Sequence, residues 1–167
     1  MGGVVNLYVV RHADAVSIGG NIRSDFDRTL NERGRADATV MAKALANIDI
    51  DIRAILTSPL VRAVETGSIF GRELHREAEA SRRLEPGFDP RLLLEAVQGI
   101  SNGAGVVVVG HQPDMSMFIS YLISPARDAV VAMETAAVAC IHLQSSGQAQ
   151  LRWILTPETV TKMNVGF

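Results

Sequence analysis

The 167-residue sequence contains a single cysteine, Cys140, which excludes an internal disulfide framework. Because Cys140 lies in the apolar run AAVACIHL, we expect a packed thiol there. No apolar run reaches the ~18 residues that a membrane-spanning helix needs. The start, MGGVVNLYVV, lacks the basic region of a signal peptide. These absences predict a soluble, cytoplasmic protein.

Charge of either sign is not in excess, since the formal net charge is only −2. The sequence therefore gives no electrostatic reason to expect nucleic acid or a membrane surface as a partner. The four histidines show no ligand spacing of the H-x-x-x-H kind, so no metal site is expected. With 47% apolar and 20% charged residues, the composition is that of one globular domain, residues 1–167.

Short, Val-rich apolar runs indicate the strands of a buried parallel sheet. Three such runs are LYVV (7–10), AILTS (54–58) and VVVVG (106–110). Two more candidate strands, AVACIHL (137–143) and AQLRWIL (149–155), flank the turn SSGQ and predict a hairpin.

Helix-start signals separate these strands. TLNE (29–32) resembles a capping box, with Thr29 as N-cap and Glu32 reaching back. Further starts are expected at Ser58-Pro59, Asp89-Pro90 and Pro113-Asp114. The alternation of strands and helices predicts an α/β layered fold with a mostly parallel sheet, and residues 14–28 form the longest irregular stretch.

Cationic side chains and histidines follow three of the predicted strands. Arg11-His12 ends the first, Ser58 ends the second with Arg62 one turn later, and His111 follows the third. In a parallel sheet these strand ends open onto the same edge, where ligands bind. A guanidinium matches phosphate oxygens two at a time, and a helix N-terminus adds N–H groups. The pattern therefore predicts a site for a tetrahedral phosphate dianion.

A histidine in such a site can act as a nucleophile. A neutral imidazole can attack phosphorus and hold the phosphoryl group, while fixed cations stabilise the charge of the transition state. A histidine at a strand end could equally be structural if it stood alone. The combination of Arg11, His12, Arg62 and His111 is what favours catalysis.

Three motifs in this order, RHADA, SPLVRAVET and VVVVGHQPD, resemble those of the histidine phosphatase superfamily. The segment DFDRTLNERG further resembles the SixA-type phosphohistidine phosphatase branch. The resemblance extends from about residue 5 to about residue 157. It implies a phosphoglycerate mutase-like, three-layer α/β/α sandwich with a mostly parallel central sheet and no large cap.

The resemblance also implies roles for five residues. His12 would be the phosphorylated nucleophile, Arg11 and Arg62 would bind the phosphoryl oxygens, and His111 would be the second histidine of the pocket. Arg28 would lie near the site and contribute to substrate binding. The family requires no metal or other cofactor.

The sequence departs from the superfamily pattern at two places. Ala13 stands where the signature Arg-His-Gly has glycine, so we expect a φ below zero there. The acid that protonates the leaving oxygen in other branches has no match, because Pro86 and Gln112 stand at its two possible positions. Asp14 and Glu85 remain alternative acids.

The missing acid favours a phosphoramidate substrate, since its nitrogen is protonated more easily than an alkoxide. The leading hypothesis is a phosphatase that acts on phosphohistidine of a phosphorelay or phosphotransfer protein. A small-metabolite phosphomonoesterase is the alternative, and a non-catalytic phosphate-binding module or a mutase is less favoured. The sequence leaves the oligomeric state open, although it is compatible with a monomer.

Overall fold

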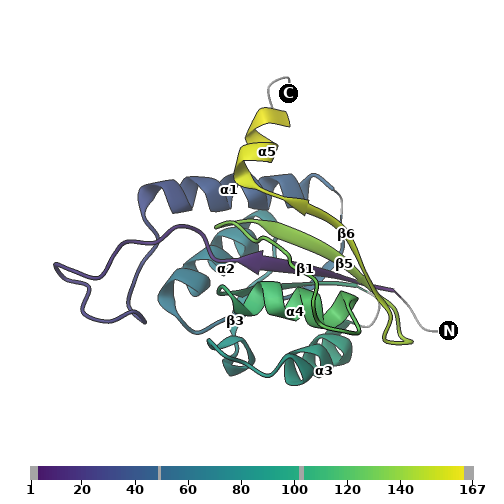
Figure 1. Cartoon of the computed structure of the whole chain (residues 1–167). Coiled ribbons are helices and arrows are strands. Elements are labelled where there is room, and N and C mark those ends of the chain that lie inside the picture. The colour runs from purple at the N-terminus through teal and green to yellow at the C-terminus, as the bar shows by residue number, and fades with distance from the viewer. Residues whose placement is uncertain (1–3, 49, 102–103, 164–167) are drawn as a thin grey trace.

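A computed structural model describes residues 4–48, 50–101 and 104–163. Its centre is a six-stranded sheet with the order β3-β2-β4-β1-β5-β6 (Figure 1). The strands are β1 (Val5–Arg11), β2 (Ile52–Thr57), β3 (Ala78–Ala80), β4 (Gly105–Gly110), β5 (Val138–Leu143) and β6 (Ala149–Leu155).

The sheet is parallel over four of its strands. β4 pairs in parallel with β1 and β2, and β2 pairs in parallel with β3, whereas β5 and β6 add an antiparallel hairpin beside β1. All six residues of β4 are buried, as the continuous valine run predicted. The carboxyl ends of β1, β2 and β4 consequently meet at the same edge of the sheet.

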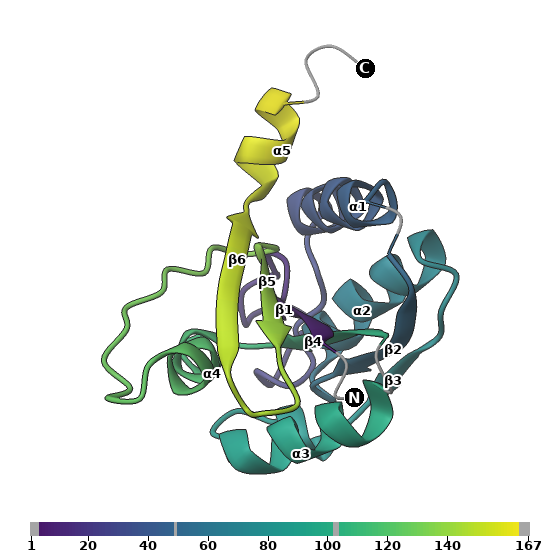
Figure 2. The same ribbon diagram turned by 90° about the vertical axis from the view of Figure 1, so that its right-hand side faces the viewer.

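The described residues form five α-helices, and the three-layer α/β/α arrangement is confirmed. α1 (Glu32–Ala46) and α2 (Val61–Glu73) pack on one face of the sheet, while α3 (Pro90–Ser101) and α4 (Asp114–Ile123) pack on the other. α5 (Pro157–Met163) extends beyond β6 and packs against α1 (Figure 1). Figure 2 shows α1 and α2 on the opposite side of the sheet from α4. None of the helices in the described ranges combines the length and the apolar character that a membrane crossing requires.

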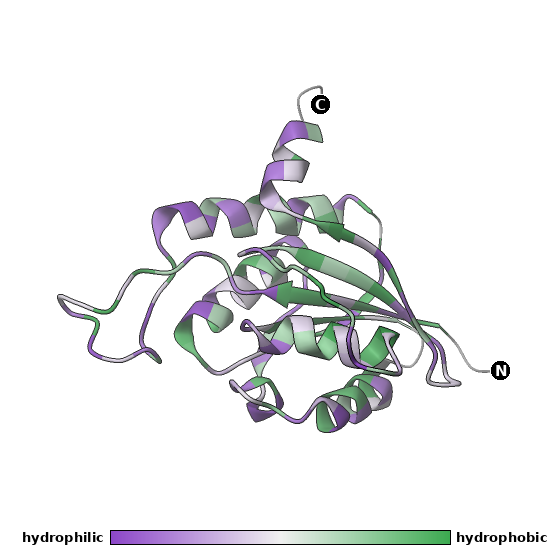
Figure 3. Cartoon of the chain, in the orientation of Figure 1, coloured by the Kyte–Doolittle hydropathy of each residue, from purple (hydrophilic) through white to green (hydrophobic). Residues whose placement is uncertain are grey.

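Alternating side chains of β1 feed two separate cores. Tyr8 and Val10 join the core beneath α1 and α2, whereas Leu7 and Val9 join the core beneath α3 and α4. This period of two is what a strand buried on both faces requires. The hydropathy colouring of Figure 3 shows the apolar strands between helices whose outer faces are polar.

The predicted N-cap of the first helix is wrong. Asn31, not Thr29, caps α1, and its side-chain oxygen accepts a hydrogen bond from the Gly34 N–H at 2.7 Å. The Thr29 carbonyl instead accepts from the Val16 N–H. Because Glu32 is the first helical residue, it lies too early to close a capping box.

The second helix also begins later than the Ser58-Pro59 signal predicted. α2 starts at Val61, and its N-cap is Leu60, which makes no side-chain capping bond. The Ser58 hydroxyl accepts a weak bond from the Leu60 N–H and also contacts His111. Ser58 is therefore not the N-cap of α2, and its hydroxyl contacts His111 instead.

Three short elements were not predicted from the sequence: the edge strand β3, a 3-10 turn at Arg82–Leu84, and α5. The starts of α3 and α4 were predicted correctly. The connection between β1 and α1 is irregular and projects beyond the carboxyl end of β1 (Figure 1). This segment lies beside the strand ends that carry the predicted site residues.

Candidate active site

Backbone hydrogen bonds continue the sheet beyond the ends of β1 and β2. The His12 N–H donates to the Gly110 carbonyl at 2.9 Å, and the Ser58 N–H donates to the Val109 carbonyl at 2.8 Å. These bonds hold the residues that follow β1, β2 and β4 side by side. The imidazole rings of His12 and His111 lie with their centroids 5.1 Å apart.

His12 is held as a neutral imidazole in one tautomer. Its Nδ1 lies 2.7 Å from the carbonyl oxygen of Ala13, which can only accept, so the ring proton resides on Nδ1. Its Nε2 accepts a hydrogen bond from Arg62 Nε at 3.2 Å. Burial, assisted by the nearby Arg62 and Arg11, lowers the pKa of His12 from 6.5 to about 4. Nε2 is therefore unprotonated at neutral pH, and its lone pair faces Arg62.

Arg62 reaches the site from the first turn of α2, and its side chain is only 7% exposed. One turn later Thr66 donates to the Arg62 carbonyl at 2.7 Å and accepts from the Ala13 N–H at 3.1 Å. Thr66 is fully buried. It thus ties the loop after His12 to the helix that carries Arg62.

His111 is the second buried imidazole of the site. Its Nε2 lies 2.7 Å from the Ser58 hydroxyl, which also accepts from the Leu60 N–H and so has its own hydrogen to donate. When Ser58 donates this hydrogen to Nε2, the imidazole proton is on Nδ1, a buried atom with no hydrogen-bond partner among the described residues. Burial, followed by the charges of His12 and Arg62, lowers the pKa of His111 to about 3.

Arg11 enters from the end of β1 and is also incompletely paired. Its Nη1 donates to the Met133 carbonyl at 2.9 Å, whereas its buried Nε has no partner in the part of the chain that is described. Burial lowers the pKa of Arg11, and the Asp14 carboxylate opposes this effect. Buried donors without partners are rare in folded proteins, so Arg11 Nε and His111 Nδ1 suit an anion that would accept from them.

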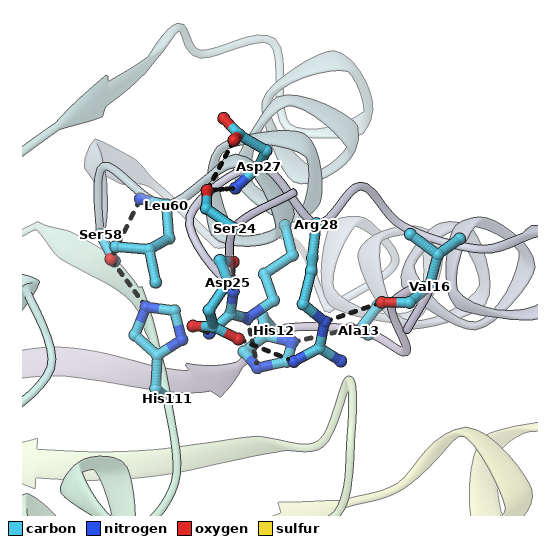
Figure 4. Close-up of polar contacts among 11 residues, drawn as sticks. His12, Ala13, Val16, Ser24, Asp25, Asp27, Arg28, Ser58, Leu60 and His111 are labelled. Atoms are coloured by element: carbon cyan, nitrogen blue, oxygen red, sulfur yellow. Dashed lines mark hydrogen bonds and ion pairs between the residues drawn. The ribbon is translucent and has the colours of Figure 1, made fainter. Parts of the chain in front are cut away.

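Asp25 is a member of the site that sequence analysis did not identify. Its carboxylate accepts from Arg62 Nη2 and from Arg28 Nη1, each at 2.9 Å, and its backbone carbonyl accepts from Arg62 Nη1 at 2.7 Å. Hydrogen bonding from Arg28 is the main cause that lowers the pKa of Asp25. Figure 4 shows the carboxylate directed toward the space between His12 and His111.

Arg28 lies beside the other cations, as expected, but it contacts Asp25 rather than either histidine. Its Nε donates to the Val16 carbonyl at 2.7 Å, and its side chain is 28% exposed (Figure 4). The signal that could have identified Asp25 is its position three residues before Arg28 in DFDR. No periodic pattern links this irregular segment to α2, so the contact with Arg62 could not be predicted.

The alternative acids lie outside the cluster of cations. Asp14 accepts from the Asn31 side chain at 2.7 Å, and thereby supports the cap of α1. Glu85 is exposed and pairs weakly with Arg82. Gln112 bonds to Ser116 within the first turn of α4. None of these contacts directs a carboxylic acid toward His12.

The arrangement can hold a tetrahedral anion in line with the His12 Nε2 lone pair. Arg62 donates to this atom, and the charges of Arg11 and Arg28 act on the same imidazole. The His111 ring lies beside it, so the cations and donors of the site suit the charge of a phosphoryl transition state. Among the described residues no group of three or more His, Cys, Asp or Glu side chains could hold a metal ion. Ala13 is absent from the non-glycine residues with positive φ, so its expected backbone conformation is confirmed.

Comparison with known proteins identifies relatives of this chain. A family model described as the histidine phosphatase superfamily (branch 1) matches residues 7–86. The phosphohistidine phosphatase SixA of Escherichia coli K12 is 28% identical over 157 residues, which cover 92% of this chain and 94% of SixA. An uncharacterised protein of Picosynechococcus sp. is 31% identical over 114 residues, 66% of this chain and 68% of that protein.

Solved structures agree with the sequence comparison. A structure of the protein histidine phosphatase SixA complexed with tungstate superposes with a TM-score of 0.83 and is 27% identical, covering 93% of this chain and 99% of its own. A SixA structure from Agrobacterium tumefaciens has a TM-score of 0.74 and 25% identity over 91% of this chain and 97% of its own. A phosphoglycerate mutase from Bacillus anthracis, 18% identical with a TM-score of 0.68, shares the fold.

Proposed function

The chain belongs to the histidine phosphatase superfamily, and on that basis we propose that it is a phosphohistidine phosphatase that uses His12 as its nucleophile. The observation that carries the proposal is the state of His12. Its neutral imidazole directs an unprotonated Nε2 toward Arg62, and the His111 ring, whose buried Nδ1 has no partner among the described residues, lies with its centroid 5.1 Å from that of His12. A nucleophile, its orienting group and the anion-binding donors are thus assembled at the same place.

The proposed reaction has two displacements at phosphorus. The His12 Nε2 lone pair attacks, the P–N bond of the substrate breaks, and its electron pair goes to the leaving nitrogen, which takes a proton. Water then attacks the phosphorylated His12, releases inorganic phosphate and restores the neutral imidazole. Arg11, Arg62 and His111 would stabilise the charge on the equatorial oxygens in both steps, and no metal or cofactor is required.

The absence of a directed acid supports a phosphoramidate substrate. Asp14 is engaged by Asn31, and Glu85 is exposed, so neither is positioned to protonate a leaving oxygen. An imidazole nitrogen can take its proton from solvent, whereas an alkoxide leaves badly without an acid. Tungstate is a tetrahedral dianion like phosphate, and its presence in the related SixA structure supports an oxyanion site here.

We further propose that the phosphohistidine is carried by a phosphorelay or phosphotransfer protein, so that the enzyme acts in signal transduction in the cytoplasm. The entrance to the site is open, since the Asp25 side chain at its mouth is 55% exposed. A side chain projecting from a folded partner could reach His12 through this opening. We treat residues 1–167 as the single domain that performs the reaction.

The test is phosphate release from a phosphohistidine protein and from p-nitrophenyl phosphate. We expect the wild type to release phosphate from the phosphoprotein and His12→Ala to abolish that release. His75→Asn is the matched control, because His75 is exposed, and its left-handed φ of 52° is one that asparagine tolerates. Activity confined to the small ester would favour the metabolite phosphatase, and no activity on either would favour a binding module.

A further inference from the structure

The proposed phosphoryl site already contains an anion, which is the carboxylate of Asp25. All three nitrogen donors of the Arg62 guanidinium are engaged: Nε by His12, Nη2 by the Asp25 carboxylate and Nη1 by the Asp25 carbonyl. The other carboxylate oxygen accepts from Arg28. A phosphoryl group that binds Arg62 therefore meets two cations, Arg62 and Arg28, that are already paired with Asp25.

From these contacts we infer that Asp25 is an internal competitor for the phosphoryl site, which the substrate must displace from Arg62 and Arg28 before it can approach His12. The inference rests on the proposed function, because it concerns the same anion-binding site. Asp25 would thereby determine how strongly an anion must interact with Arg62 and Arg28 in order to bind. Weakly held anions would leave the carboxylate in place, and a dianion that accepts from several protein donors at once would replace it.

The geometry allows this displacement without movement of the backbone. The strap that carries Asp25, residues 24–28, is anchored to α2 because the Val61 N–H donates to the Phe26 carbonyl at 3.1 Å. Arg62 Nη1 holds the Asp25 carbonyl, and Ser24 closes a local turn with Asp27. Only the Asp25 side chain, which is 55% exposed, has to rotate toward solvent.

Displacement would leave the donors correctly oriented for phosphate. Arg62 would keep its bond to the Asp25 carbonyl, which holds the guanidinium in place, and its Nε would pass from His12 Nε2 to a phosphoryl oxygen when that nitrogen attacks. Arg62 Nη2 and Arg28 Nη1 would both become available to phosphoryl oxygens. The carboxylate therefore acts as a temporary ligand that keeps two cations together in the empty site.

Binding of inorganic phosphate, measured by isothermal titration calorimetry, tests the inference without any turnover. If only a fraction of the molecules has Asp25 displaced, the apparent dissociation constant exceeds the intrinsic constant by the inverse of that fraction. For a partly exposed ion pair we expect Asp25→Asn and Asp25→Ala to tighten phosphate binding by roughly 3- to 10-fold. The alanine variant is included because, unlike asparagine, alanine has no amide group that could form a new contact with phosphate.

Asp27→Asn is the matched control, since it removes the same charge from the same strap but has no contact with Arg62. We expect its dissociation constant to stay near the wild-type value. Unchanged or weaker phosphate binding in both Asp25 variants would overturn the inference and make Asp25 a purely structural support of Arg62. Equal tightening in Asp27→Asn would also overturn it. If no variant bound phosphate, the proposed function would fail along with it.

Discussion

Arg62 Nε lies 3.2 Å from His12 Nε2, so a permanent cation donates to the atom that the proposed reaction uses as its nucleophile. This contact fixes the imidazole plane and disfavours protonation of Nε2. It would also be exchanged for a contact with the phosphoryl group once His12 is phosphorylated.

Arg62→Lys should lower kcat/KM for a phosphohistidine protein by roughly 10²- to 10³-fold. Lysine keeps the charge, but it lacks the planar fork that contacts His12 and the strap together. Steady-state kinetics would measure the loss. Arg72→Lys, on the exposed face of the same helix, should retain wild-type activity. Wild-type kinetics for Arg62→Lys would exclude Arg62 from transition-state binding.

Ser58→Ala should reduce kcat/KM by roughly 2- to 10-fold, which is the worth of one neutral hydrogen bond. The substitution removes the partner of His111 Nε2 and with it the preference for a proton on Nδ1. Ser68→Ala provides the control, because its hydroxyl donates to the Val64 carbonyl on the exposed side of α2, away from His111. A loss of activity of the same size in both serine variants would contradict a specific role for the contact between Ser58 and His111.

Thr66→Val should lower the free energy of unfolding by about 1–3 kcal/mol, because it leaves the buried Ala13 N–H without an acceptor. Urea denaturation would measure the change. Thr39→Val is the matched comparison, since Thr39 makes the same kind of bond to the carbonyl four residues earlier, but on an exposed face of α1. If both substitutions lowered the free energy of unfolding by the same amount, the contact between Thr66 and Ala13 would not contribute to stability.

Acid should destabilise the fold through its two buried imidazoles. In the unfolded chain His12 and His111 titrate near 6.5, whereas burial lowers their pKa values to about 4 and about 3 in the folded protein. Between these values the unfolded state binds more protons, so the free energy of unfolding falls as the pH is lowered from about 6.5 toward 4.

Urea denaturation at pH 7, 6 and 5 would reveal this dependence. His12→Gln and His111→Gln should each flatten it, because glutamine does not titrate. His75→Asn should leave it unchanged, since His75 is exposed. If the free energy of unfolding of both glutamine variants depended on pH as it does in the wild type, His12 and His111 would not be the groups responsible.

The sequence predicted the parallel core of the sheet and the meeting of Arg11, His12, Arg62 and His111. Each of these residues follows a strand or opens a helix whose apolar pattern is strong, so its place is determined by the topology of the sheet. Arg28 was placed near the site by resemblance alone. The roles of these residues in catalysis remain predictions for the kinetic experiments.

The features that sequence analysis missed depend on tertiary contacts. Thr29 and Asn31 are both good N-caps by residue type, and the choice is made by Asp14, whose backbone and side chain both accept from Asn31. Strand β3 has only three residues, too few for a periodic pattern. Asp25 lies in an irregular loop, where residue spacing says nothing about spatial neighbours.

The backbone bond from His12 to Gly110 ties one side of the pocket to the central strand β4, whereas the other side is the irregular segment 24–28. The His12 amide belongs to the centre of the sheet, so its hydrogen exchange should require opening of the most stable part of the fold. The strap at 24–28 is held by a few bonds and can exchange on its own. Variation in that strap could therefore retune which phosphorylated partners are accepted while the nucleophile keeps its position.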